Sequence, residues 1–214
     1  SEDKTVAIAE KMGVKVFIHP LENNFSAQRN FGLLQAKGDW VLFVDADERV
    51  SESLTYEIGN VLHHKAVEMY NAFSIRRIDT MWGKQLHYGE NGNMRLIRLG
   101  RKTAGEWKGA VHEVWSVKGK IGELKNPLYH YPHQTVSEFL KEINYYTSIR
   151  AKELFKKRKK VYFWSIIIYP KAKFFVNYFF KRGFLDGIPG LVIAMLMSFH
   201  SFLVRGKLWQ LWQK

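Results

Sequence analysis

The chain has 214 residues, enough to bury a sizeable core, and its hydrophobic and charged fractions are those of a globular protein rather than a disordered one. It contains no cysteine, which excludes disulfide bonds and thiolate metal sites. The net charge of +13 is unevenly placed, because twelve Lys or Arg and two Glu between Lys141 and Arg182 give that segment alone a net charge of +10.

The first part of the chain reads as helices and strands that alternate with short connections. In chain order the expected elements are a helix over 3–12, a strand over 14–18, a helix over 27–36 after Ser26, a strand over 40–44 and a helix over 52–64 after Ser51. This order predicts a βαβ-type, largely parallel sheet. No strand precedes the first helix and no signal peptide opens the chain, so we expect a fragment that lacks the first strand of its domain.

The middle of the chain adds antiparallel pieces, and the remainder is helical. Further strands are expected over 72–77, 94–99, 111–117 and 128–131, and helices over 137–160 and 162–180. After a break at 183–187, an apolar segment over 188–204 has about 17 residues, the lower limit for a membrane span. Its Pro, Gly, Ser and His residues favour an interfacial or re-entrant helix. We therefore expect an α/β domain over 1–134 and a basic, aromatic-rich helical extension over 135–214.

Three carboxylates follow the apolar strand that begins at Trp40. Asp45, Asp47 and Glu48 stand at its C-terminal end, where ligands bind in open α/β sheets. Two acids separated by one residue can hold a hard divalent cation, and such a cation brings phosphates with it. The motif indicates metal-assisted chemistry on a phosphorylated substrate, with a plain surface loop as the alternative. A haloacid dehalogenase-type phosphohydrolase with Asp45 as nucleophile is disfavoured, because Arg49 stands where that family has Thr or Val.

A helix start precedes the acidic strand. Ser26 is the expected cap, and Arg29 and Asn30 follow it closely. Helix N-termini attract phosphate, and an arginine in the first turn adds a forked hydrogen-bond donor. From these residues alone, a plain capped helix with a solvated arginine is the alternative.

Together these segments resemble the family 2 glycosyltransferases with the GT-A fold, and most nearly the branch that extends lipopolysaccharide core. The resemblance spans nearly the whole chain, and the order and spacing of its pieces carry it. The matching segments lie at 24–32, 36–40, 44–50, 109–113, 127–130 and 182–187. The resemblance implies a Rossmann-like mixed sheet flanked by helices. Residues 1–5 resemble the segment after the second strand in that family, so the first strand, with its acidic residue for the uracil base, is expected to be missing.

The resemblance implies that a sugar moves from a nucleotide-diphosphate donor, a UDP-sugar by expectation, to an acceptor hydroxyl with inversion of the anomeric carbon. It implies that Asp47, and less directly Asp45, hold Mn²⁺ or Mg²⁺ against the diphosphate, with His130 as a third contact. A polar histidine at a sheet edge is the alternative for His130. Arg95 and Arg98 alternate with apolar residues, and a solvated strand face is the alternative for at least one of them. The expected donor-binding residues are Arg29, Asn30, Asp45, Asp47 and Arg95.

A direct displacement needs a base near the acceptor hydroxyl. Glu113 is the expected base, facing Asp47 across the sugar pocket, with His112 as an orienting partner. A solvated glutamate at a strand edge is the alternative for Glu113. Asp79 and Glu90 are the other candidates for the base.

The helical extension combines basic, aromatic and aliphatic residues, which favours an anionic membrane surface as its partner. Aromatic side chains favour the membrane interface, and each Lys or Arg near anionic lipid contributes roughly 1 kcal/mol. Nucleic-acid binding, the rival explanation of the charge, predicts exposed aromatics on a basic groove and no apolar segment like 188–204. Simple packing of these helices on the catalytic domain is the other alternative.

The sequence therefore predicts a metal-dependent glycosyltransferase of cell-envelope glycan synthesis, peripheral on the cytoplasmic face of the inner membrane and without a nucleic-acid partner. Its expected acceptor is lipid-linked or is lipopolysaccharide core. The alternative is a non-catalytic membrane-surface module that retains a GT-A remnant.

Overall fold

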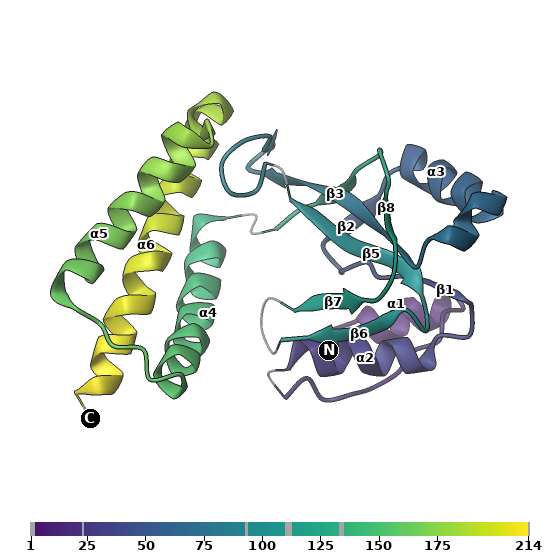
Figure 1. Ribbon diagram of the computed structural model, residues 1–214, viewed down its shortest axis with the longest axis horizontal. Coiled ribbons are helices and arrows are strands. Elements are labelled where there is room, and N and C mark those ends of the chain that lie inside the picture. The colour runs from purple at the N-terminus through teal and green to yellow at the C-terminus, as the bar shows by residue number, and fades with distance from the viewer. Residues whose placement is uncertain (1–2, 23, 93, 110–112, 133–134, 214) are drawn as a thin grey trace.

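A computed structural model describes residues 3–22, 24–92, 94–109, 113–132 and 135–213 (Figure 1). The helices are α1 (Thr5–Lys11), α2 (Phe25–Gln35), α3 (Glu52–His63), η1 (Lys65–Met69), α4 (Val136–Lys156), α5 (Phe163–Phe175), η2 (Val176–Phe180), η3 (Gly183–Asp186) and α6 (Gly187–Trp212). The strands are β1 (Trp40–Leu42), β2 (Glu48–Val50), β3 (Ala72–Met81), β4 (Lys84–Gln85), β5 (Arg95–Arg101), β6 (Gly105–Lys108), β7 (Val114–Val117), β8 (Ile121–Glu123) and β9 (Leu128–His130).

The main sheet is mixed and runs in the order β1-β5-β3-β9-β2, with β4 and β8 also paired to β3. Strand β3 is parallel to β8 and β9, whereas β1 is antiparallel to β5 and β2 is antiparallel to β9. Strands β6 and β7 form a separate antiparallel pair. The expected mixed sheet flanked by helices is confirmed, but the expectation of a largely parallel first part is wrong for the strands described here.

The strand expected over 14–18 is not formed. Residues 14–18 have no regular secondary structure, and Val14, Phe17 and Ile18 are exposed. A strand is stable only when a neighbour satisfies its backbone groups, and none of the described strands pairs with this segment. The β propensity of these residues therefore does not decide their conformation.

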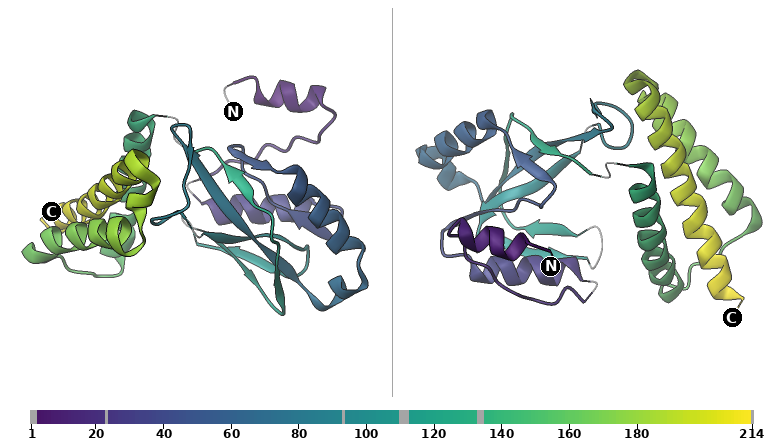
Figure 2. Two further views of the ribbon diagram at one scale, coloured as in Figure 1. Left: turned by 90° about the horizontal axis from the view of Figure 1, so that it is seen from above. Right: turned by 180° about the vertical axis from the view of Figure 1, so that it is seen from behind.

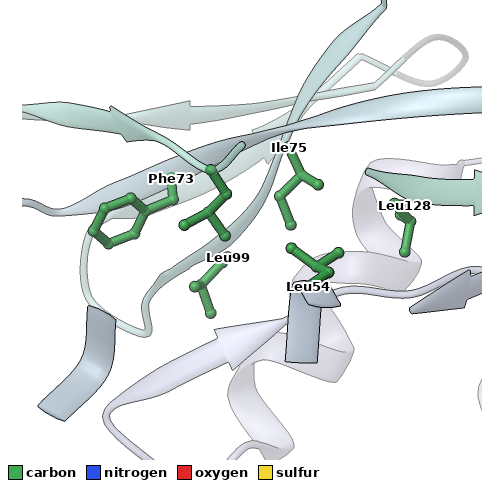
Figure 3. Packing of buried hydrophobic residues seen from close by; sticks show 6 residues of the cluster. Leu54, Phe73, Ile75, Leu99 and Leu128 are labelled. Atoms are coloured by element: carbon green, nitrogen blue, oxygen red, sulfur yellow. The ribbon is translucent and has the colours of Figure 1, made fainter. Parts of the chain in front are cut away.

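Helix α3 packs its apolar face on the sheet. Ser51 caps it as expected, because its hydroxyl accepts the backbone N–H of Leu54. Figure 3 shows the Leu54 side chain pointing toward Phe73, Ile75 and Leu99 of the sheet, and all four are buried. Burial of each such side chain stabilises the fold by about 1.5–3 kcal/mol. This core holds β3 and β5 in place, and these strands carry several of the charged residues described below.

Helix α2 begins two residues earlier than expected. Its cap is Asn24, whose side chain accepts the N–H of Ala27, and Ser26 lies inside the first turn and donates to Asn24. Leu33 of this helix packs with Trp107 and Trp115 of the β6–β7 pair in a second core. That packing holds α2 beside the β6–β7 pair.

The C-terminal helices form a group to one side of the sheet, as both views in Figure 2 show. Helices α4 and α5 both pack against α6. A third apolar core, which includes Met81, Leu86, Phe139 and Ile193, joins this group to the connection between β3 and β5. The boundary expected at 134/135 touches residues outside the described ranges, and the division into two domains stays a proposal.

Helix α6 is longer than the apolar segment expected over 188–204. Within the part of the chain that the structure describes, the continuous helical segment Gly183–Trp212 is the one helix long and apolar enough to cross a membrane, by length and composition. Helices α4 and α5 pack against it, and 33% of its most apolar window is buried inside the protein. Length alone therefore does not distinguish a span from a helix that lies at the interface.

Candidate active site

The turn between β1 and β2 carries the acidic motif. The backbone N–H of Glu48 donates to the carbonyl of Asp45, and the backbone N–H of Asp45 donates to Oε2 of Glu48 at 2.9 Å. The Glu48 side chain is fully buried, so this turn is held from inside the fold. Asp47 lies between the two and its side chain is 49% exposed.

Two arginines hold the carboxylate of Asp45. Nη2 of Arg29 lies 2.8 and 3.0 Å from its two oxygens, and Nη2 of Arg98 lies 2.6 Å from Oδ2. The same Arg98 nitrogen donates to Oε1 of Glu48 at 2.7 Å. Hydrogen bonds between charged groups are shorter and stronger than neutral ones, so the motif is tied firmly to α2 and to β5.

Arg29 also connects the motif to the expected base. Its Nε donates to Oε1 of Glu113 at 2.7 Å, and its guanidinium lies 4.6 Å from the ring centroid of Trp107. The side-chain amide of the next residue, Asn30, donates to the backbone carbonyl of Trp107 and accepts the backbone N–H of Trp107. The packing of α2 against β6 thereby brings Glu113 and Asp45 to the same guanidinium. His112, the expected partner of Glu113, lies outside the described residues.

His130 lies between two aspartates. Strand β9 runs between β2 and β3, and in its register His130 stands opposite Glu48 on one side and Asp79 on the other. Its Nδ1 is 2.8 Å from Oδ1 of Asp79, and its Nε2 is 3.1 Å from Oδ2 of Asp47. Asp79 is buried and is further held by Asn91, which donates at 2.8 Å, and by Arg77 at 3.1 Å.

The two aspartates change the proton affinity of this histidine. Burial alone would lower the pKa of His130, but the hydrogen bonds with Asp47 and Asp79 outweigh it and raise the pKa to about 9. The bond from His130 in turn lowers the pKa of Asp47, against a smaller opposing effect of burial. His130 and Asp47 therefore form a charged pair at neutral pH, with Asp47 still open to solvent.

The first 116 residues match the sequence model described as Glycosyl transferase family 2, which is more than half of the chain. This chain belongs to glycosyltransferase family 2. Its members transfer sugars from nucleotide-sugar donors to glycan acceptors, so the clustered charges above are the candidate active site of a glycosyltransferase.

Curated relatives agree with this assignment. The chain is 29% identical over 218 residues to an uncharacterized glycosyltransferase of Rickettsia felis, a match that covers 97% of this chain and 77% of the relative. It is 26% identical over 203 residues to the lipopolysaccharide core biosynthesis glycosyltransferase LpsC of Rhizobium meliloti, covering 91% and 72%. A shorter match, 36% over 101 residues, is to a TPR repeat-containing protein of Synechococcus elongatus and covers 47% of this chain.

Family 2 enzymes generally use a divalent metal ion, and the donor atoms present here fit one in part. Among the described residues, no set of three His, Cys, Asp or Glu side chains is arranged to hold a metal. Mg²⁺ is commonly held by one or two carboxylates, with substrate phosphates and water completing its shell. The carboxylate of Asp47 suits that arrangement, with His130 beside it at 3.1 Å, whereas the carboxylate of Asp45 is already bound by two arginines.

Some expected residues of this glycosyltransferase lie elsewhere, and others were missed. Arg95 contacts the carbonyl of Leu124 and the carboxylate of Glu123 rather than the acidic motif, and its donor-binding role stays a prediction. Arg98, the other arginine considered on this strand, is the one that bonds Asp45 and Glu48. The sequence interpretation did not predict that Glu48 is buried. A buried carboxylate needs a cationic partner, which Arg98 provides here.

Proposed function

We propose that this family 2 glycosyltransferase is inverting and metal-dependent and uses a nucleotide-diphosphate sugar, a UDP-sugar, as its donor. Its proposed acceptor is lipid-linked or is lipopolysaccharide core, in cell-envelope glycan synthesis. The observation that carries the proposal is the convergence of a solvent-open Asp47–His130 pair with the Arg29 bridge between Asp45 and Glu113. The name of the Rhizobium relative, a lipopolysaccharide core biosynthesis enzyme, supports this choice of pathway.

On the donor side we assign the metal contacts to Asp47 and His130. A bound Mn²⁺ or Mg²⁺ would neutralise charge on the leaving diphosphate. His130 must give up a proton to serve as a ligand, since a protonated imidazole cannot coordinate. Asp45 contributes by orienting Arg29 and Arg98, and Asn30 by fixing α2 on Trp107. The guanidinium of Arg29, in the second turn of α2, is the proposed phosphate contact, because an arginine offers phosphate a forked pair of hydrogen-bond donors.

On the acceptor side we assign the general base to Glu113. Its Oε1 accepts the hydrogen bond of Arg29, which leaves Oε2 for the proton of the acceptor hydroxyl. The side chain is 15% exposed, so it is oriented by its surroundings and still reachable. His112 stays a proposed orienting partner. The other candidates are less suited, because Asp79 is buried and bound to His130, and Glu90 is bound to Lys173.

We place the enzyme peripherally on the cytoplasmic face of the inner membrane. Large apolar side chains are exposed along the C-terminal helices, in a region that also carries the excess of positive charge. Those of α5, η2 and η3 include Phe163, Trp164, Ile168, Tyr169, Phe175, Phe179, Phe180, Phe184 and Leu185. A surface of this kind is costly in water and favourable at an anionic bilayer, where a lipid-linked acceptor would be presented.

The test is calorimetric binding of UDP and a panel of UDP-sugars in the presence and absence of Mn²⁺. We expect binding that requires the metal and is lost in Asp47→Asn, while Asp39→Asn, which removes an exposed carboxylate outside the site, binds as the wild type does. Binding that survives Asp47→Asn would refute the metal assignment. Binding to liposomes with no nucleotide binding at all would favour the non-catalytic membrane module instead.

A further inference from the structure

A cavity lies away from the acidic motif, between the sheet and the C-terminal helices. It has a volume of about 750 Å³. Its walls come from β3, from the connection between β3 and β5, and from the residue that follows η2. The lining residues are Arg76, His87, Tyr88, Gly89, Glu90, Gly92, Met94 and Lys181.

The lining has an excess of positive charge. Arg76 and Lys181 are cationic, and the carboxylate of Glu90 is already bound by Lys173 Nζ at 2.6 Å and by Asn177 at 3.2 Å. Arg76 is poorly satisfied, because Nη2 makes only a long 3.4 Å bond to the carbonyl of Gly92. Its Nε is buried and has no hydrogen-bond partner among the described residues. Solvent does not reach that Nε, so a ligand in the cavity would meet the terminal nitrogens of Arg76, and these together with Lys181 favour an anion.

The walls of the cavity are fixed by the segment Arg182–Gly187, which the chemistry of the active site does not use. The buried carboxylate of Asp186 accepts the backbone N–H of His87 at 3.2 Å and of Tyr88 at 2.9 Å. The N–H of Gly89 donates to the carbonyl of Lys181 at 2.9 Å. These bonds hold the β3–β5 connection against η3, so the cavity is preorganised and binding does not have to order it.

The same connection reaches the active site. Asn91 stands between the lining residues Glu90 and Gly92, and its amide donates to Asp79, which is bonded to His130. On the other side, next to Lys181, Phe180 is 82% exposed and Phe184 is exposed as well. The cavity thus lies between the exposed apolar surface of the helices and the proposed metal contact.

We propose that this cavity binds an anionic group of the acceptor, a phosphate or a carboxylate, and so sets which acceptors the enzyme takes. This inference rests on the proposed function, since it assigns the second substrate of the same reaction. Arg76 and Lys181 are the anion contacts, and the apolar part of a lipid-linked acceptor would extend toward Phe180 and Phe184. A neutral glycolipid would leave the two cations unpaired and would bind more weakly.

The experiment measures binding of mannose 6-phosphate, with mannose as the uncharged probe, to the full chain by NMR titration. We expect the phosphate ester to bind at least tenfold more tightly than the neutral sugar. Lys181→Gln and the double variant Arg76→Gln, Lys181→Gln should remove that difference. Lys171→Gln, which removes an exposed charge on α5 outside the cavity, is the matched control and should retain it. Equal binding of the two sugars, or a phosphate preference that survives the double variant, would overturn the proposal.

Two further arms separate this inference from its alternatives. Mn²⁺-dependent UDP binding should be the same in Lys181→Gln as in the wild type. If the wild type itself binds no UDP, that result refutes the proposed function and not the anion site in the cavity. Vesicles of phosphatidylglycerol and of phosphatidylcholine test a bulk headgroup as the source of the phosphate. If phosphatidylglycerol vesicles bind through Arg76 and Lys181 while mannose 6-phosphate does not bind, the cavity serves the membrane surface and the acceptor assignment is overturned.

Discussion

Nε2 of His130 lies 3.1 Å from Oδ2 of Asp47, although 83 residues separate them in the chain. The contact exists because β9 pairs with β2 on one side and with β3 on the other, which sets the histidine beside the acidic turn. It is the contact on which the donor-side proposal depends.

Removal of Arg98 should destabilise the fold severely. Arg98→Ala leaves the fully buried carboxylate of Glu48 without its 2.7 Å partner. Breaking a buried ion pair from one side costs about 3–5 kcal/mol in the free energy of unfolding, which urea denaturation measures. Arg95→Ala on the same strand loses an exposed pair with Glu123 and should cost about 0–1 kcal/mol. Similar losses for the two variants would contradict the role given to Arg98.

The metal-free protein should lose stability as the pH rises through the pKa of His130. Folding raises that pKa from 6.5 to about 9, so the stabilisation is fully present below 6.5 and disappears above 9. Thermal melting in a chelator, from about pH 6 to about pH 10, should show wild type and His130→Gln converging at the alkaline end. If the difference in melting temperature between wild type and His130→Gln grows with pH, His130 is neutral in the folded protein.

Glu113→Gln should slow transfer and spare donor binding. Loss of a general base costs about 10²–10⁴-fold in rate, whereas Mn²⁺-dependent UDP binding does not need Glu113. Glu106→Gln, an exposed glutamate on the neighbouring strand, is the control and should transfer normally. Steady-state rates against UDP affinity separate the two effects. A variant that loses both together would indicate that Glu113 acts through Arg29 on the donor.

Two glycines of α6 should respond oppositely to alanine. A Cβ at Gly190 would lie 2.0 Å from the carbonyl oxygen of Gly183, so Gly190→Ala must displace the η3 turn and lower the melting temperature. At Gly206 nothing lies within 4 Å, and Gly206→Ala should stabilise the helix by about 0.5–1 kcal/mol. A neutral Gly190→Ala would show that this turn yields easily.

Membrane binding should depend on the exposed aromatics of the C-terminal helices. Phe180→Asp places a charge in that surface and should reduce binding to phosphatidylglycerol vesicles in a sedimentation assay. Tyr56→Asp, at an exposed aromatic on α3, is the matched control and should bind as the wild type does. Equal binding of all three proteins would leave the apolar surface without a membrane role.

Local sequence patterns predict one part of the candidate site, the acidic motif, but not the arginines that bind it. A strand followed by Asp45 and Asp47 is recognisable because a buried run and a cation-binding spacing are both local patterns. The choice between Arg95 and Arg98 is not local. A register shift between Phe73 and Ser74 helps set which β5 side chains face the acidic turn, and no single-strand pattern encodes it.

The sequence by itself determined the family, through the order and spacing of its matching segments. It also determined the order of most helices and strands, the cap at Ser51 and the position of the acidic turn, because each of these depends on neighbouring residues. Tertiary structure alone decided that Arg29 bridges Asp45 and Glu113, which lie 16 and 84 positions away. It also left residues 14–18 without a strand, since β structure needs a partner and the described sheet offers none there. Contacts of this range follow from strand register and helix packing, which the whole chain sets together.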